Sequence, residues 1–116
     1  MKSDSIIIGG GLSGLTAAIA LAEAGQKVTV VSAGQSSLHF GSGSFGLLGY
    51  NIEGQEVSNP LEAISSLSEN HPYNKVGAEN ISVLAKEAKA LLNRSGISTT
   101  GSEKANHYRL SPIGLA

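Results

Sequence analysis

The chain of 116 residues contains no cysteine, which excludes disulfides, thiolate metal sites and cysteine nucleophiles. It also lacks any apolar run close to the roughly 20 residues that a membrane-spanning helix needs. Its first residues lead directly into a predicted strand and leave no room for a signal peptide, so we expect a soluble, cytoplasmic protein. The formal net charge of −1 gives no indication of a nucleic-acid partner.

Charged residues are scarce, at 15% of the chain against about 25% in ordinary soluble domains. In residues 1–52 only Lys2, Asp4, Glu23 and Lys27 are charged. A free-standing domain would carry more charge on its surface, so we expect the N-terminal half to be covered by further protein. The chain is then a fragment that is inactive alone and self-associates through a bare apolar sheet face.

Several catalytic signatures are also absent. There are no paired carboxylates, no His-Glu-x-x-His and no Gly-x-Ser-x-Gly, so hydrolytic chemistry is not expected. His71 and His107 have no carboxylate or second histidine at metal-ligand spacing, and we predict no metal site. Arg94 and Arg109 could bind a substrate phosphate, although a lone arginine is most often solvated.

A glycine motif follows the first apolar run. Residues 5–8 read Ser-Ile-Ile-Ile and pass into Gly9-x-Gly11-x-x-Gly14, which opens an alanine-rich segment. In such a motif the first glycine allows a tight turn, the second lets backbone approach a pyrophosphate, and the third lets helix and strand pack closely. The alternative is that the glycines serve only close packing. We predict that a phosphate is held at Gly9, Gly10, Gly11, Leu12, Ser13 and Gly14.

The context of the motif defines a βαβ unit over residues 4–32. A helix is expected from about residue 12 to 24, Gly25 should end it, and Val28 to Val31 should form a second strand. The predicted fold class is therefore α/β, a Rossmann-like FAD/NAD(P)-binding half-domain with a parallel sheet. It should be three-layered but incomplete, with residues 1–116 forming the N-terminal part of a flavin- or dinucleotide-binding domain.

The remaining elements are predicted from local signals. A glycine- and serine-rich cofactor loop is expected over residues 33–54. Helices are expected at about 60–70, where Asn59 and Pro60 form a helix start, and at about 78–94, where apolar residues recur on one face. Short strands are expected at about 97–100 and 107–110.

Position 32 departs from the usual dinucleotide pattern. The end of the second strand normally supplies an acid that binds the adenosine ribose, but this chain has Ser32 there and no acid between Glu23 and Glu53. The departure weakens the case for NAD and for a conventionally bound FAD. It leaves open a cofactor with a phosphate but no adenosine ribose, such as FMN.

The loop after Ser32 is the second candidate part of the cofactor site. Its glycines permit close backbone approach to a flat ring, and its serine hydroxyls can donate hydrogen bonds. A flexible connector is the alternative. His39 is a weak catalytic candidate, as a proton relay or a ligand of a substrate phosphate, against a histidine satisfied by neighbouring backbone. The candidate cofactor residues here are Ser32, Gly34, Gln35, Ser36, Ser42, Gly43 and Ser44.

These motifs together resemble one protein family. Four segments carry the resemblance: SIIIGGGLSGLTA from residue 5, GQSSLHFGSGSFGLL from residue 34, HPY from residue 71 and SPIG from residue 111. In this order they are similar to the B subunit of bacterial anaerobic glycerol-3-phosphate dehydrogenase. The loop from residue 34 discriminates most, because many flavoproteins share the first motif. Ser32 in place of an acid is then a family feature.

The resemblance implies a flavoprotein subunit with FMN as cofactor and FAD as the alternative. It implies the A and C subunits of the dehydrogenase as partners, of which the iron–sulfur C subunit ties the complex to the inner face of the cell membrane. The complex would oxidise sn-glycerol 3-phosphate to dihydroxyacetone phosphate and pass electrons to the quinone pool for fumarate or nitrate reduction. Two alternatives stay open: a non-catalytic electron-relay or scaffolding subunit, and a fragment of another glycine-rich FAD-dependent oxidoreductase.

Overall fold

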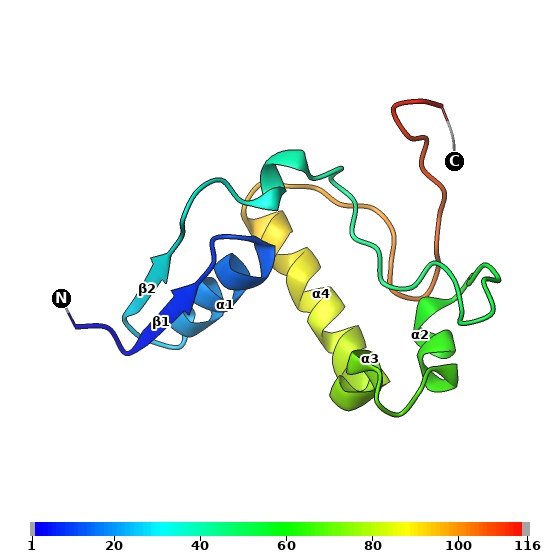
Figure 1. The fold of residues 1–116 in the computed structure, drawn as a ribbon, viewed down its shortest axis with the longest axis horizontal. Coiled ribbons are helices and arrows are strands. Elements are labelled where there is room, and N and C mark those ends of the chain that lie inside the picture. Colours follow the sequence, from blue (N-terminus) through cyan, green and yellow to red (C-terminus); the bar gives the residue numbers. More distant parts are fainter. Residues whose placement is uncertain (1, 115–116) are drawn as a thin grey trace. The chain divides into compact units, whose positions relative to one another are not determined.

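The computed structural model describes residues 2–114, and the chain forms two compact units, Met1–Ser44 and Phe45–Ala116 (Figure 1). The division falls inside the single cofactor loop that the sequence predicted for residues 33–54. Residues 33–44 belong to the first unit and residues 45–54 to the second. All the predicted cofactor-binding positions lie in the first unit.

The first unit is a βαβ motif. Strand β1 (Ser5–Ile8) is followed by helix α1 (Leu12–Glu23) and strand β2 (Val28–Val31), and the two strands pair in parallel with Ser5 opposite Val28. Backbone bonds extend the ladder at both ends, from Asp4 N to Lys27 O at 2.8 Å and from Gly9 N to Val31 O at 2.8 Å. Parallel pairing requires a crossover, which α1 supplies.

Helix α1 contacts both strands and so covers one face of the two-stranded sheet. Alternate residues of β1 point to opposite faces. Ile6 and Ile8 are 67% and 89% exposed, so the other face of the sheet is bare. Of the three layers expected, the first unit forms the sheet and one helical layer, and self-association through the bare face stays a prediction.

Gly25 ends α1, as its position in the sequence predicted. Its φ of +87° lies in the left-handed region, where glycine carries no Cβ penalty. The amide of Gly25 donates to the Ala22 carbonyl at 3.0 Å and that of Gln26 donates to Leu21 at 3.1 Å. These bonds satisfy the last carbonyls of the helix and turn the chain into β2.

The second unit is built from short helices around one longer helix. Its core is small: Ile64 is fully buried and Ile81 is 7% exposed. Asn59 caps the first of these helices by accepting a hydrogen bond from the Glu62 amide at 3.3 Å. The elements are α2 (Pro60–Ala63), η2 (Ile64–Ser66), α3 (Pro72–Val76) and α4 (Ala78–Arg94).

Three expectations for the second unit are corrected: the helix at 60–70 and the strands at 97–100 and 107–110. The single helix predicted for residues 60–70 is α2 followed by the 3-10 turn η2, and the chain becomes extended at Leu67. The segment His71-Pro72-Tyr73 lies at the start of α3, a helix that was not predicted from the sequence. The Nδ1 atom of His71 accepts the Tyr73 amide at 3.1 Å, and Pro72 occupies the first helical position, where its missing N–H costs nothing.

The strands predicted at 97–100 and 107–110 do not form in the described residues. The amide of Ile97 still donates to Leu92 as part of the α4 terminus, at 2.9 Å, and Gly101 breaks the extended run with a φ of +95°. Residues 107–110 follow Asn106, which side-chain bonds fix against another loop. A favourable β pattern is not enough where no ladder partner is adjacent. No helix among residues 2–114 is long and apolar enough to cross a membrane.

Gly14 packs closely against the turn that precedes α1. A Cβ built on Gly14 would lie 2.1 Å from the carbonyl oxygen of Gly9 and 3.3 Å from Cγ2 of Ile7. No side chain can occupy that space without moving backbone. Gly14 therefore performs the packing role that the third glycine of the motif predicts.

We expect Gly14→Ala to destabilise the protein by roughly 1–3 kcal/mol, the usual range for overpacking. Alanine favours a helix over glycine by about 1 kcal/mol, but the clash is with backbone and outweighs that gain. Urea denaturation measures the difference. Gly34→Ala is the matched control, because nothing lies within 4 Å of a Cβ at Gly34. Equal stability of the two variants would contradict the packing role.

Candidate flavin-binding site

The candidate site begins at the turn between β1 and α1. Gly9 has a φ of +115°, a conformation that favours glycine, and it lets the chain reverse directly after β1. Gly11 is the N-cap residue of α1, and its carbonyl accepts the Leu15 amide at 2.9 Å. The sequence thus places the start of a helix immediately beyond the end of a parallel strand, the position where α/β folds bind ligands.

The start of α1 has no side-chain partner of its own. No side chain caps it, and its first turn contains no acidic residue. The amides of the first turn of a helix have no acceptor within the helix, and they coincide with the positive end of the helix dipole. The positions that present these donors are Leu12, Ser13 and Gly14. This arrangement suits an anionic group such as a phosphate.

Space for such a group is present beside the turn. Nothing lies within 4 Å of a Cβ built on Gly9 or Gly11. The backbone at these positions is therefore open to approach by a ligand, whereas the Cα of Gly14 packs against the Gly9 carbonyl and the Ile7 side chain. The three motif glycines divide into two that face open space and one that packs.

Ser32 is brought directly to this turn. A Cβ built on Gly10 would lie 3.1 Å from the Ser32 hydroxyl oxygen, so the end of β2 and the glycine turn are adjacent. The Ser32 hydroxyl donates to the Gly34 carbonyl at 2.9 Å. The predicted residues Gly9 to Gly14, Ser32 and Gly34 thus form one cluster at the carboxyl ends of β1 and β2.

The remaining predicted residues lie further along the loop. Ser36 caps the 3-10 turn η1 (Ser37–Phe40) by accepting the Leu38 amide at 3.3 Å. Ser42 and Ser44 form a second small cluster, with their hydroxyl oxygens 2.7 Å apart across Gly43, whose φ is +71°. The role of these residues and of Gln35 toward a cofactor stays a prediction.

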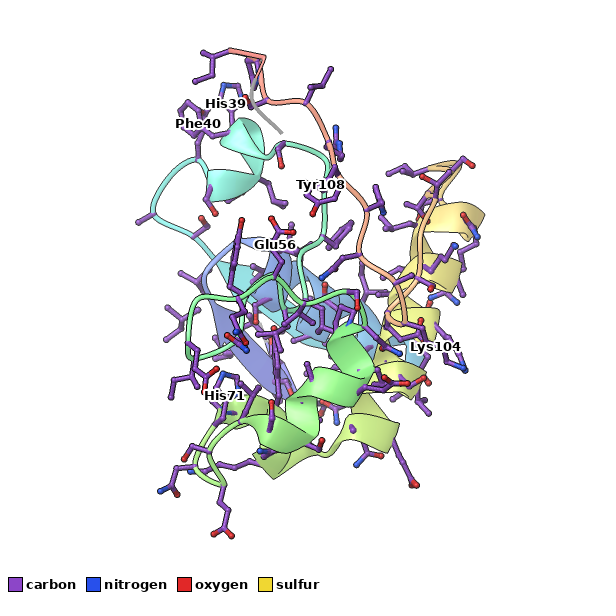
Figure 2. The ribbon with its side chains drawn as sticks, turned by 90° about the vertical axis from the view of Figure 1, so that its right-hand side faces the viewer. His39, Phe40, Glu56, His71, Lys104 and Tyr108 are labelled. Carbon is purple, nitrogen blue, oxygen red and sulfur yellow. The ribbon has the colours of Figure 1, made fainter. Side chains whose placement is uncertain are left out.

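His39 is exposed within η1. Its ring contacts that of Phe40 edge-on, with centroids 5.1 Å apart, and Phe40 is 85% exposed (Figure 2). No group of three His, Asp or Glu side chains that could hold a metal occurs within residues 2–114. The imidazole is exposed on a glycine-rich loop, and its catalytic role stays a prediction.

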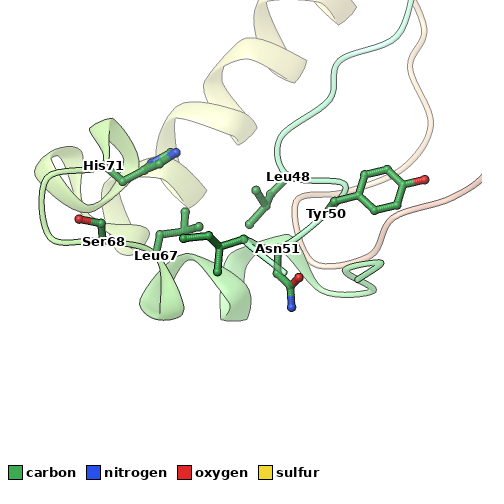
Figure 3. A pocket seen from close by; sticks show the side chains of 7 residues that line it. Leu48, Tyr50, Asn51, Leu67, Ser68 and His71 are labelled. Carbon is green, nitrogen blue, oxygen red and sulfur yellow. The ribbon is translucent and has the colours of Figure 1, made fainter. Parts of the chain in front are cut away.

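A hollow of the second unit shares no residue with this site. It is a cavity of about 280 Å³ lined mainly by Leu48, Ile52 and Leu67, with His71 at its edge (Figure 3). Asn51 also lines it, but its side chain is engaged in the adjacent turn, where it accepts the amides of Glu53 and Gln55. The side chains of Asn51, Ser68 and His71 in this hollow accept local backbone amides, so we assign it no part in cofactor binding.

The geometry at the β1–α1 turn is that of a nucleotide-binding protein, and comparison defines the class more closely. The chain belongs to the FAD binding domain family, which it matches over residues 4–115. A flavin is therefore the class of cofactor. No solved structure matches the chain.

The curated relatives that the chain matches share one name. The chain is 49% identical over 117 residues to the B subunit of anaerobic glycerol-3-phosphate dehydrogenase from Pectobacterium carotovorum, and 51% identical over 118 residues to that of Yersinia enterocolitica. The protein of the same name from Aliivibrio fischeri is 41% identical. Each alignment covers 98% of this chain but 26–28% of the relative. The resemblance drawn from the motifs is confirmed.

We expect Gly11→Val to abolish flavin binding while the protein still folds. The extended backbone of Gly11 accepts a branched residue, but the side chain would project into the open space beside the uncapped helix start. Bound flavin is measured from the visible spectrum of the purified protein, and folding from circular dichroism. Gly46→Val is the control, since a Cβ at Gly46 also meets nothing within 4 Å. Normal flavin content in Gly11→Val would overturn the site.

Proposed function

We propose that this chain contributes the cofactor-phosphate site of the flavoprotein B subunit of an anaerobic, quinone-linked glycerol-3-phosphate dehydrogenase. The whole protein would oxidise sn-glycerol 3-phosphate to dihydroxyacetone phosphate and pass electrons to the quinone pool for fumarate or nitrate reduction. The observation that carries the proposal is the uncapped, open glycine turn at the start of α1. The relatives' shared name supports the choice of reaction.

The chain's own groups bind and orient the cofactor. The first-turn amides of α1 would donate to the phosphate, and Gly9 and Gly11 would allow its close approach. A bound flavin would supply the two-electron acceptor needed to oxidise a secondary alcohol. His39 is the candidate to hold the substrate phosphate or to move a proton, since it is exposed on the loop that follows β2.

The cofactor is proposed to be FMN, with FAD as the alternative. An adenosine ribose is normally held by a carboxylate at the end of the second strand, and here Ser32 occupies that position. Its hydroxyl proton is already committed to the Gly34 carbonyl. The site therefore offers a phosphate receptor but no carboxylate for a ribose. The name of the matched family favours FAD, which makes the cofactor's identity a sharp test.

Ser32→Glu should increase FAD binding relative to FMN by severalfold, because it supplies the missing ribose acceptor beside Gly10. Ser32→Gln introduces a side chain as long as glutamate but uncharged, and it should not increase FAD binding relative to FMN. Apoprotein of each variant is titrated with both flavins, and the cofactor released from the native protein is identified by chromatography. Recovery of FAD alone from the native protein would exclude FMN.

The proposed partners are the A and C subunits of the dehydrogenase. The relatives are named as its B subunit, and that name implies a complex with further subunits. The protein would lie in the cytoplasm, peripheral to the inner face of the membrane and attached only through its partners. The present chain spans 28% of the length of the relatives from Pectobacterium and Yersinia. We therefore assign the activity to the whole protein and expect these 116 residues to be inactive alone.

Turnover should require both the flavin-containing A subunit of the dehydrogenase and the full-length protein that contains this chain. The assay follows reduction of a soluble quinone by sn-glycerol 3-phosphate, with glycerol as the control that lacks the phosphate. We expect the Gly11→Val protein to lower the rate of the reconstituted complex by at least tenfold. An unchanged rate with the A subunit alone would instead assign the present protein to scaffolding, because an electron relay would be needed to reduce the quinone.

A further inference from the structure

Two tyrosines flank a carboxylate on the surface of the second unit. Tyr50 and Tyr108 are 62% and 74% exposed, and Glu56 is also exposed. The Tyr108 hydroxyl donates to Oε2 of Glu56, and the two side chains point toward each other (Figure 2). We call Tyr50, Glu56 and Tyr108 the tyrosine–glutamate patch. The flavin site already described uses none of its residues.

Tyr50 and Glu56 of the patch lie on a β-hairpin. Tyr50 and Glu56 face each other in an antiparallel bridge. The flanking backbone bonds run from Asn51 N to Gln55 O and from Val57 N to Gly49 O, both at 2.9 Å. Residues paired in this way hold their side chains close together on one face. The relative position of Tyr50 and Glu56 is thus fixed by backbone.

Tyr108 is held against this hairpin from a distant part of the sequence. The side-chain amide of Asn106 donates to the carbonyls of Leu48 at 2.8 Å and Val57 at 2.6 Å. The Asn106 backbone amide donates to the Ser58 carbonyl at 2.9 Å. Three bonds from one residue therefore fix the segment that carries Tyr108. The patch is organised before any ligand arrives, which favours binding.

A hollow of about 390 Å³ adjoins the patch. It is lined by the three patch residues together with Val57, Asn106 and His107. The ring of Tyr50 points away from the other residues of the neighbouring apolar cavity (Figure 3). Tyr50 lines both hollows, and its exposed side chain is accessible to a ligand of the patch.

The chemistry of the patch selects a cation. A carboxylate attracts positive charge, and the faces of aromatic rings attract cations through their quadrupole. Hydrogen bonding to Glu56, followed by the charge of Glu56, raises the pKa of Tyr108. Tyr108 thus stays a neutral hydroxyl that orients the carboxylate. A planar guanidinium suits the arrangement better than an ammonium, because it can stack on a ring while it donates to a carboxylate.

The surroundings indicate a protein as the source of that cation. Ile52 and Leu110 are 88% and 78% exposed, and they lie two residues from Tyr50 and Tyr108 in the sequence. Exposed apolar residues and exposed tyrosines that lie close together in the sequence are typical of protein interfaces, where arginine is also enriched. We propose that the tyrosine–glutamate patch is a docking site for an arginine side chain presented by a partner protein of the complex. This inference rests on the proposed function, which supplies a partner.

The test is assembly of the complex. The full-length protein is co-expressed with the C subunit and with an affinity-tagged A subunit, and the recovered protein is measured at 150 mM salt. We expect Glu56→Lys to lower recovery at least tenfold, and Glu56→Gln and Tyr50→Leu to lower it severalfold. Glu53→Lys makes the same charge change at the tip of the hairpin, away from the hollow, and should stay within twofold of the native protein.

Two solution measurements accompany the assembly test. In Glu56→Gln the alkaline absorbance titration should show one tyrosine pKa returned to its ordinary range, because Tyr108 loses its carboxylate acceptor. Acetyl-arginine methylamide should shift the amide resonances of the patch in the native protein more than tetramethylammonium does. An unchanged tyrosine titration would overturn the geometry of the patch. A stronger effect of tetramethylammonium would overturn the guanidinium in favour of a small quaternary cation.

Flavin content separates this inference from the proposed function. It is measured on the same preparations, and the patch variants should keep it. Normal flavin with unchanged assembly of Glu56→Lys would overturn the docking site alone. No association of the native protein with its two proposed partners would also overturn it. Loss of flavin in every preparation, the native one included, would count against the proposed function instead.

Discussion

The first unit depends on the contact between Gly14 and the carbonyl of Gly9. At a separation that admits no Cβ, α1 begins directly above the end of β1. If the helix were displaced, the first-turn amides would no longer lie beside the carboxyl end of the strand, and Ser32 would no longer meet Gly10. The close packing of one glycine is thus the condition for the open space beside the other two. Stability and binding are linked through a single turn.

This link explains why the packing and binding interpretations of the motif are not exclusive. The sequence left open whether the glycines serve close packing or a phosphate. The structure assigns Gly14 to packing and leaves Gly9 and Gly11 facing open space. The amides at the uncapped start of α1 can bind a ligand only if it can reach them, and the open space beside Gly9 and Gly11 allows that approach.

How much could be predicted from the sequence depended on the range of the interaction. The βαβ unit and α4 follow from local signals: glycines at the turns, short apolar runs for the strands, and apolar residues on one face of the helix. The strands expected at 97–100 and 107–110 failed because a strand needs a partner, and the pattern within four residues does not say whether one is adjacent. Helix α3 was missed although Pro72 at a first helical position is a recognised start signal.

The two surface sites differ in the same way. The glycine turn is contiguous in sequence, so its residues could be listed in advance. The tyrosine–glutamate patch joins positions 52 residues apart, and the bonds that join them run from the Asn106 amide to backbone carbonyls. Carbonyls carry no sequence signature, since every residue has one. A site whose residues are joined by side-chain-to-backbone bonds therefore cannot be predicted from a sequence motif. A partner that binds this patch recognises residues that only the folded chain brings together.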